Sequence, residues 1–154
     1  MITKNIADLH KLGALKKALG VDYGLKKTGI AITDKDLRMS LPLCTLNIKN
    51  PALLIDNIRI LTIEYEVFLL VLGVPDQDYY DGSLYLNFAH QLYAKLLLPI
   101  YLQDESYTSK MANNLLLDTG FNKRKRAVLG DQVAAKLILD EFLEKWQNFQ
   151  KRIP

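Results

Sequence analysis

The sequence is poor in the residues that build disulfides and histidine metal sites. Its 154 residues include one cysteine, Cys44, and two histidines, His10 and His90. A single cysteine excludes an internal disulfide and a multi-cysteine zinc site, and two histidines are too few for a histidine-based metal cage. Scarce cysteine is typical of a reducing compartment, so we expect a cytoplasmic location.

Long hydrophobic runs and a large net charge are absent as well. The longest apolar stretches, 67–74 and 96–102, fall well short of the roughly 20 residues that a membrane-spanning helix needs. The first 19 residues mix charged and apolar side chains, unlike a signal peptide, and we expect no membrane partner. The net charge of +3 does not indicate nucleic-acid binding through composition alone.

Common nucleotide and nucleophile motifs are missing too. Gly24 and Gly29 have the glycine spacing of a P-loop, but Ile30 and Ala31 stand where that motif requires Lys followed by Ser or Thr. The chain has no dinucleotide fingerprint and no nucleophile elbow. Cys44 lies in an expected strand and is interpreted as a small apolar residue.

The hydrophobic pattern predicts one α/β domain. Apolar segments joined by short turns predict three antiparallel strands near 18–24, 28–34 and 38–47, with Pro42 placing part of the third strand at an edge. Helical stripes then alternate with continuous apolar runs at 67–73 and 98–103, which predict two more strands. The expected helices begin near Pro51, Tyr85, Thr108 and Asp131, and the sum is a mixed sheet flanked by helices.

The domain boundaries follow from the same pattern. Residues 18–150 are expected to form a single domain, and 151–154 a C-terminal tail. Residues 1–17 are an added arm or a helix, and the pattern does not choose between them.

Three acidic residues lie where a carboxylate is costly or well placed for chemistry. Asp22 is inside an otherwise apolar strand. Glu105, with its neighbour Asp104, follows the last predicted strand, where ligands of open α/β sheets collect. Asp131 is expected in the first turn of the last helix, on the stripe that faces the sheet. Taken singly, each also has a structural explanation, such as hydrogen bonding at a turn, capping or the helix dipole.

Together the three acids fit a divalent-metal site. Carboxylate oxygens from different elements are the ligands that Mg²⁺ or Mn²⁺ prefers. In phosphodiester hydrolysis one ion would activate a water molecule and a second would stabilise charge on the leaving oxygen. Without ions the clustered carboxylates should repel one another and raise the pKa of at least one of them.

Two basic segments supply candidate phosphate contacts. Lys26 and Lys27 lie in the first predicted turn, and four consecutive residues, Lys123, Arg124, Lys125 and Arg126, form a predicted loop directly before the last helix. Such a run is usually a solvated loop, but its position beside Asp131 favours a role in holding a nucleic-acid strand.

Four ordered blocks resemble the bacterial YqgF/RuvX family of pre-16S rRNA nucleases, also called Holliday junction resolvase-like proteins. They are 19–34 (LGVDYGLKKTGIAITD), 71–75 with 81–83, 104–109, and 123–126 leading to 131–135. The resemblance implies an RNase H-like fold with a five-stranded mixed sheet, and cleavage of nucleic acid with Mg²⁺ or Mn²⁺ during ribosomal RNA maturation. It places the catalytic and metal-binding acids at Asp22, Glu105 and Asp131.

This chain departs from the family pattern at three places. Ser106 stands where an Arg is usual, the loop after Gly73 is slightly longer, and Lys27 replaces an Arg. The last change keeps the charge but loses the bidentate guanidinium. Because all three acids persist, we expect these departures to affect substrate preference and rate more than the type of reaction.

Three functions remain open at this point. The first is a nuclease for precursor ribosomal RNA, acting in contact with pre-ribosomal particles. The second is a resolvase of four-way DNA junctions, which needs symmetric cuts, and nothing in the sequence specifies a monomer or a dimer. The third is a non-catalytic RNA-binding module for ribosome assembly, in which the acids only stabilise the fold.

Overall fold

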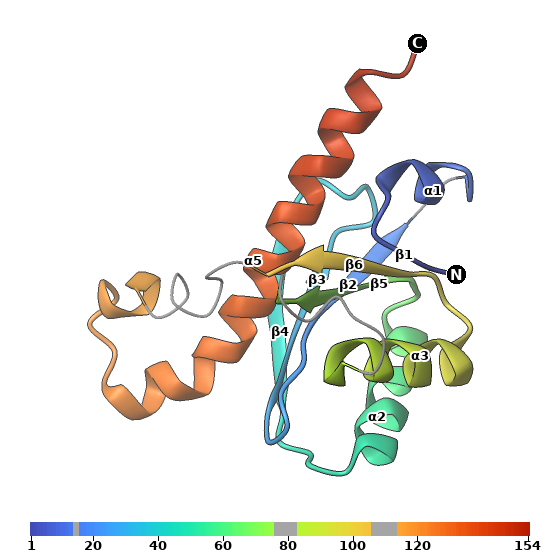
Figure 1. Ribbon diagram of the computed structural model, residues 1–154. Helices are drawn as coiled ribbons and strands as arrows, with labels where there is room; N and C mark the ends of the chain where they lie inside the picture. Colours follow the sequence, from blue (N-terminus) through green and yellow to red (C-terminus); the bar gives the residue numbers. More distant parts are fainter. Residues whose placement is uncertain (14–15, 76–82, 106–113) are drawn as a thin grey trace.

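The computed structural model of the chain describes residues 1–13, 16–75, 83–105 and 114–154 (Figure 1). Its strands form a single mixed sheet in the order β1-β6-β5-β2-β3-β4. The strands are β1 (Ile2–Thr3), β2 (Lys17–Asp22), β3 (Thr28–Thr33), β4 (Ser40–Leu46), β5 (Val67–Val74) and β6 (Ile100–Asp104).

The antiparallel half of the sheet agrees with the prediction. Strands β2, β3 and β4 pair antiparallel in sequence order, and Asp22 lies opposite Gly29 at the β2–β3 turn. Pro42 is on β4, the edge strand, and the β3–β4 register shifts between Ile30 and Ala31. A proline is tolerated there because an edge strand has no partner on its outer side.

The parallel half contains one strand more than expected. Strands β5 and β6 run parallel to β2, as predicted, and their carboxyl ends lie together. The additional strand is β1, which pairs parallel with β6 through Ile2 and Ile100. Two residues are too short to show strand periodicity, which is why the sequence pattern does not distinguish an arm from a helix in the N-terminal segment. It contains both β1 and the short helix α1 (Ile6–His10).

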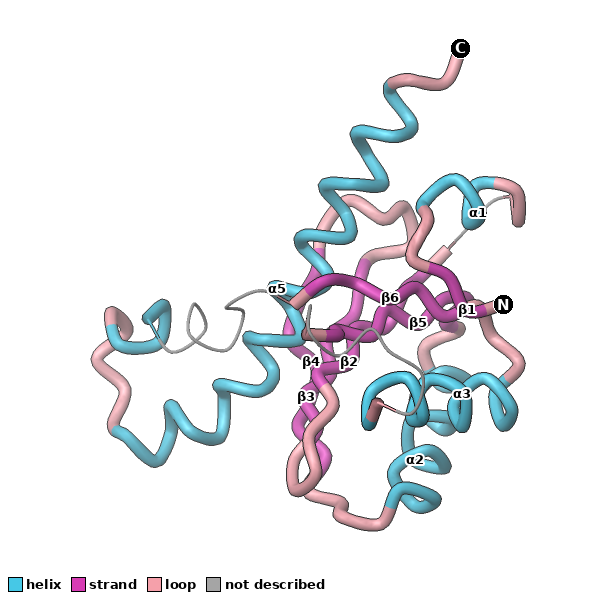
Figure 2. The backbone as a smooth tube through the Cα atoms, viewed as in Figure 1, coloured by secondary structure: helices cyan, strands magenta, loops and turns pink. Residues whose placement is uncertain are grey.

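Helices cover both faces of the sheet (Figure 2). Helices α2 (Pro51–Glu64) and α3 (Leu84–Leu96) pack on one face over a core that includes Leu70, Leu72 and Phe88. Helix α5 (Lys123–Lys151) runs along the other face, over a second core that includes Val71, Ile138 and Phe142. The alternation of Val71 and Leu72 between the two cores is the period-two pattern of a strand buried on both faces. No helix among the described residues is both long and apolar enough to cross a membrane.

Helix α5 begins two turns earlier than predicted, and this is a correction. Residues 123–126, expected as a loop, are its first turn, and the side chain of Asn122 caps it by accepting a hydrogen bond of 2.8 Å from the Lys125 backbone N–H. Lys and Arg are good helix formers, so a capped basic run extends the helix instead of ending it. Asp131 therefore lies in the third turn, where the helix dipole no longer explains an acid.

Most of the remaining predicted boundaries differ by a few residues. Helix α3 begins after Ser83, whose hydroxyl accepts from the Leu86 backbone N–H, and α5 continues to Lys151, the first residue of the expected tail. The helix predicted from Thr108 falls largely outside the described residues. Its last part, 114–117, is helical and ends before Gly120, whose φ of +75° suits the stop predicted there.

Candidate active site

Asp22 and Glu105 meet at the carboxyl ends of the parallel strands, on the face covered by α5. Asp22 ends β2, and the next residue, Tyr23, turns to the opposite face, where its ring stacks on Phe88 with 3.9 Å between centroids. Glu105 follows β6, and its backbone N–H donates to the Val74 carbonyl at 2.9 Å. The two carboxyl groups are hydrogen-bonded to each other.

Gly73 makes this pairing possible. Strand β5 separates β2 from β6, so the two backbones are about 10 Å apart. A side chain at 73 would project into the gap, because a Cβ atom there would lie 2.8 Å from Glu105 Oε2 and would overlap the Ile138 side chain. The absence of a side chain at this position therefore lets Glu105 lean across β5 towards Asp22.

The pKa values of both carboxyl groups are raised above their ordinary values. The pKa of Asp22 is raised from 3.8 to about 9, and burial is the largest cause. The charge of Glu105, the hydrogen bond with Glu105 and the charge of Asp131 follow in that order. Burial also raises the pKa of Glu105, followed by the charge of Glu141, while the hydrogen bond from Asp22 lowers it. At neutral pH the proton of this carboxyl pair is therefore expected on Asp22, in the hydrogen bond with Glu105. A raised pKa was predicted for the cluster, and the main cause is burial, with repulsion second.

Asp131 reaches the site through a close approach of α5 to β3. A Cβ atom at Gly29, opposite Asp22, would collide with the backbone carbonyl of Asp131, so only glycine admits the helix at this distance. Burial raises the pKa of Asp131, and the charge of Lys27 lowers it. Lys27 therefore lies near Asp131, which connects the β2–β3 turn with the acidic residues.

Sequence reasoning missed two residues beside the three acids. Gln103 lies on β6, is 1% exposed, and donates from Nε2 to Glu141 Oε2 of α5 at 3.0 Å. The charge of Glu141 in turn contributes to the raised pKa of Glu105. The available signal was weak: a single amide in the apolar run 98–103, and a glutamate on the border of the apolar stripe of α5.

The acids suit a divalent cation by their chemistry, although they do not form a closed ligand shell. Within 1–13, 16–75, 83–105 and 114–154, no three His, Cys, Asp or Glu side chains form a group that could hold a metal ion as they stand. Asp22 and Glu105 instead share a proton, and a cation that bound both would have to displace it. The carboxylate donors are those that Mg²⁺ and Mn²⁺ prefer. Their role as metal ligands and catalytic residues stays a prediction.

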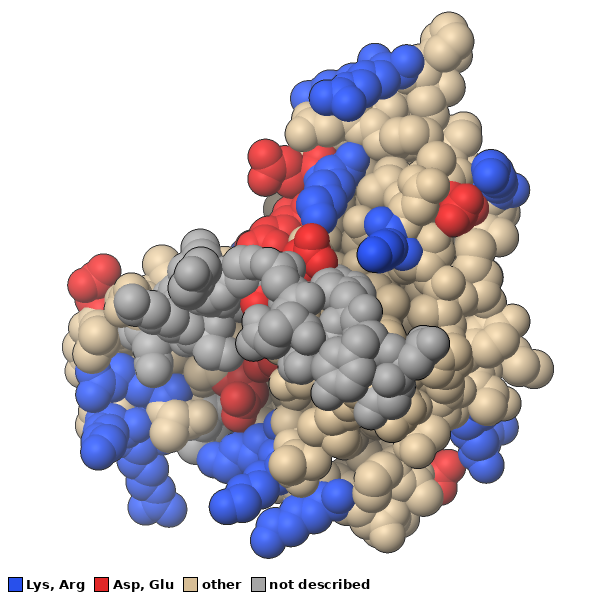
Figure 3. Space-filling model, viewed as in Figure 1, with Lys and Arg blue, Asp and Glu red and all other residues tan. Residues whose placement is uncertain are grey.

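The basic residues gather beside the acids. Lys26, Lys27 and the first three residues of the 123–126 run are exposed, and Arg126 is half-buried. Figure 3 shows Lys and Arg side chains over the start of α5 and over the β2–β3 turn, with acidic side chains visible between them. The Lys125 ammonium lies 4.0 Å from the centre of the Phe121 ring, which holds the run at the helix start. Ser106 and the loop after Pro75 lie outside the described residues.

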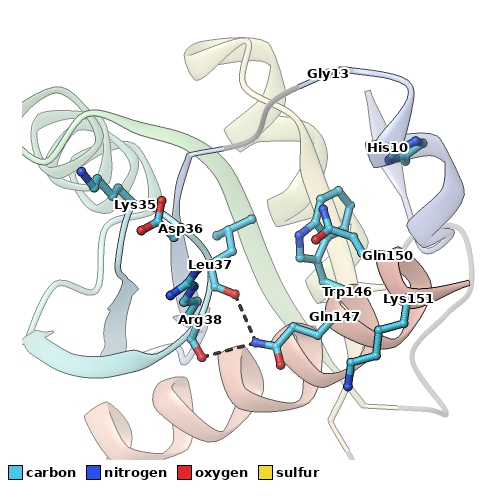
Figure 4. Close-up of a pocket in the computed structure, with 10 residues that line it drawn as sticks. All are labelled: His10, Gly13, Lys35, Asp36, Leu37, Arg38, Trp146, Gln147, Gln150 and Lys151. Carbon is cyan, nitrogen blue, oxygen red and sulfur yellow. Dashed lines mark hydrogen bonds between the residues drawn. The ribbon is translucent and has the colours of Figure 1, made fainter. Parts of the chain in front are cut away.

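A cavity lies at the other end of α5, away from the acids. It has a volume of about 1210 Å³ and lies between α1, the β3–β4 turn and the last turns of α5 (Figure 4). Gln147 closes one wall by donating to the Leu37 and Arg38 carbonyls at 3.3 and 3.4 Å. None of the three acids lines this cavity, so its size does not mark the candidate active site.

Two solved structures of Holliday junction resolvases share this fold. A fowlpox virus resolvase, in a structure with Holliday junction DNA, matches with a TM-score of 0.55 at 12% identity, over 84% of this chain and 97% of its own. Thermus thermophilus RuvC, in complex with a Holliday junction substrate, matches with a TM-score of 0.53 at 12% identity, over 84% and 96%. At this identity the likeness concerns the fold, and it confirms the predicted RNase H-like class.

Sequence comparison then defines the family. Residues 16–145 match the model of the RuvX family, described as Holliday junction resolvase. A protein of Rickettsia africae (strain ESF-5) named "Putative pre-16S rRNA nuclease" is 35% identical over 96% of this chain and 99% of its own length. A protein of the same name from Orientia tsutsugamushi (strain Ikeda) is 36% identical over 96% and 97%. The chain therefore belongs to the RuvX (YqgF) family, as the sequence blocks predicted.

Proposed function

We propose that this protein is a metal-dependent nuclease that cleaves the precursor of 16S ribosomal RNA. The observation that carries the proposal is the Asp22–Glu105 carboxyl pair over Gly73, with Asp131 of α5 beside it. Family membership and relatives named for this activity support the substrate. We place the reaction in the cytoplasm and in contact with pre-ribosomal particles, because the substrate is made and assembled there.

The proposed roles of the acids follow from their protonation. Asp22 and Glu105 hold one proton between them in the free protein, so the pair can release it when a cation binds. Mg²⁺ or Mn²⁺ bound by Asp22, Glu105 and Asp131 would lower the pKa of a water molecule and stabilise the charge on the leaving oxygen. Hydrolysis adds this water across one P–O bond of the phosphodiester.

The proposed role of the basic residues is to hold the strand over the acids. Lys27 lies near Asp131, and the exposed Lys and Arg residues of α5 begin two turns before it. Lysine and arginine neutralise phosphates without reading sequence, which suits positioning along a backbone. Binding would also relieve an unfavourable arrangement, since basic side chains at the start of a helix oppose its dipole.

The test is cleavage of a structured precursor RNA by the purified protein. We expect cleavage with Mg²⁺ or Mn²⁺ and its loss with a chelator, and Asp22→Asn should abolish it. Asp56→Asn is a matched control, because Asp56 is an exposed residue of α2 with one loose contact to Lys95 at 3.9 Å. Equal cleavage by wild type and Asp22→Asn would refute the assignment of the site.

A second candidate is resolution of four-way DNA junctions. The description of the family model and the two junction-bound structural neighbours favour it. The same preparation should be offered a synthetic junction: paired, symmetric nicks and a stable dimer would support this function, whereas cleavage restricted to RNA would exclude it. Salt-sensitive RNA binding that persists in Asp22→Asn and Asp131→Asn, with no cleavage by the wild type in any metal, would instead indicate a non-catalytic assembly module.

A further inference from the structure

Gln103 is a polar side chain buried in the sheet, and its orientation is determined by its donors. Its Nε2 atom donates to Glu141 Oε2 at 3.0 Å and to the Asp104 carbonyl at 3.2 Å. Rotating the amide by 180° would point its oxygen at a carboxylate and a carbonyl, so both amide hydrogens are committed as described. The Oε1 atom is buried and has no hydrogen-bond partner among the described residues.

The unpaired oxygen lies beside the candidate active site. Gln103 is opposite Gly73 in the β5–β6 register, on the face covered by α5. Glu105 Oε2 lies over Gly73, within 2.8 Å of the position that a Cβ atom would take there. The Gln103 carboxamide is thus next to the Glu105 carboxylate and is joined to Glu141 on the helix above.

Glu141 is the acidic residue on the far side of Glu105 from Asp22. Ile138, one turn earlier in α5, packs over Gly73, and Phe142, the next residue, packs against Tyr101 with ring centroids 5.2 Å apart. These contacts place Glu141 over β6. Its charge acts on Glu105 and raises the pKa of that carboxyl group. Burial raises the pKa of Glu141, and the hydrogen bond from Gln103 lowers it.

We propose that Gln103 and Glu141 form an outer layer of the metal site, in which Gln103 Oε1 and Glu141 accept hydrogen bonds from water bound to a divalent cation at Glu105. This inference rests on the proposed metal-dependent function. Mg²⁺ gives up its water reluctantly, and every metal-bound water presents O–H donors. Both proposed partners are acceptors, and the donors of Gln103 are already used in holding Glu141 in place. Gln103 and Glu141 would therefore be positioning residues that act through metal-bound water and bind neither the cation nor the substrate directly.

A purely structural role makes a different prediction. If Gln103 and Glu141 only fastened α5 to β6, their replacement would lower the melting temperature and leave the affinity of the folded protein for a cation unchanged. Metal affinity is thus the readout that separates the two roles, and it requires neither a substrate nor turnover.

The test is titration of the full chain with Mn²⁺ alone, followed by calorimetry. Glu141→Gln removes the charge at constant shape, and its carbonyl can still accept from Gln103 Nε2. Glu144→Gln removes the same charge three residues later, from an exposed position on the same helix. We expect Glu141→Gln to weaken Mn²⁺ binding about tenfold, as outer-layer changes commonly do. Glu144→Gln should bind as the wild type does, and all three melting temperatures should agree.

Gln103→Met provides an independent second variant, because it keeps the length of the side chain and removes every hydrogen bond. It should weaken Mn²⁺ binding at a temperature where circular dichroism shows the protein to be folded. Unchanged affinity in Glu141→Gln, or an equal loss in Glu144→Gln, would overturn the inference. Asp22→Asn tests the proposed metal site itself, independently of the outer layer. If Asp22→Asn binds Mn²⁺ as the wild type does, the proposed metal site is wrong, and the proposed function fails with it.

Discussion

Replacing Asp22 by Asn should make the metal-free protein more stable near neutral pH. The pKa of Asp22 rises from 3.8 to about 9 in the folded protein, whereas in the unfolded chain the carboxyl ionises near its ordinary value of about 4. Between these two pH values the folded protein holds more protons than the unfolded chain. The free energy of unfolding therefore falls as the pH rises through this window, and the loss is complete above about pH 9.

The magnitude follows from the width of the window. Each unit between the ordinary pKa and the working pH costs about 1.4 kcal/mol, so at pH 7 the ionisable carboxyl lowers stability by at most about 4 kcal/mol. Because Asp22 is only half-buried, water and relaxation of Glu105 reduce this, and we expect about 2–4 kcal/mol. An asparagine cannot ionise, and its N–H can still donate to Glu105. For a domain of this size the gain corresponds to a melting temperature higher by about 5–15 °C.

The assay is thermal and urea unfolding of wild type, Asp22→Asn and the control Asp56→Asn at pH 5, 7 and 8.5, in the presence of a chelator. The advantage of Asp22→Asn should grow from pH 5 to pH 8.5, and the control should follow the wild type. A variant less stable than the wild type at pH 7, or one with the same dependence on pH, would show that Asp22 is not held protonated in the fold.

Three further predictions follow from the same geometry. Gly73→Ala should displace Glu105 and Ile138, lowering stability by about 1–3 kcal/mol and abolishing Mn²⁺ binding in calorimetry; a variant that binds Mn²⁺ normally would show that the gap over β5 is not needed. Mn²⁺ at about 100 times its dissociation constant should stabilise the wild type by about 2.7 kcal/mol and Asp22→Asn much less, as measured by melting; equal stabilisation of both would place the ion elsewhere. Replacing Lys123, Arg124 and Lys125 by Gln should reduce the slope of log affinity against log salt for double-stranded nucleic acid by about 2–3, whereas a charge-matched variant at Lys35, Lys49 and Lys151 should not; equal slopes would remove the start of α5 from the binding surface.

Local pattern was enough for much of the fold. The spacing of apolar residues along the chain depends only on backbone geometry. It predicted the antiparallel strands joined by short turns, the buried strand β5 and the apolar stripe of α5. The same reasoning singled out Asp22, because an acid in an apolar strand needs a partner whatever the fold. The ordered sequence blocks then indicated the family, which the match over residues 16–145 confirms.

Boundaries set by capping were harder to predict. The start of α5 depends on one side chain, Asn122, which caps the helix. Four consecutive charged residues follow it, and such a run is also typical of a solvated loop. Strand β1 depends on β6, about 100 residues away, because two residues have no period of their own. In both cases the deciding contact was weak or distant in the sequence.

The sequence by itself determined which residues are chemically unusual, since burial of a charge is costly in any fold. Only the tertiary structure decided how they meet. The strand order puts β5 between Asp22 and Glu105, so a glycine on a third strand controls whether their carboxyl groups touch. The crossing of α5 over β6 pairs Gln103 with Glu141, 38 residues apart in the chain. Such contacts depend on the packing of elements across the sheet, which local periodicity does not encode.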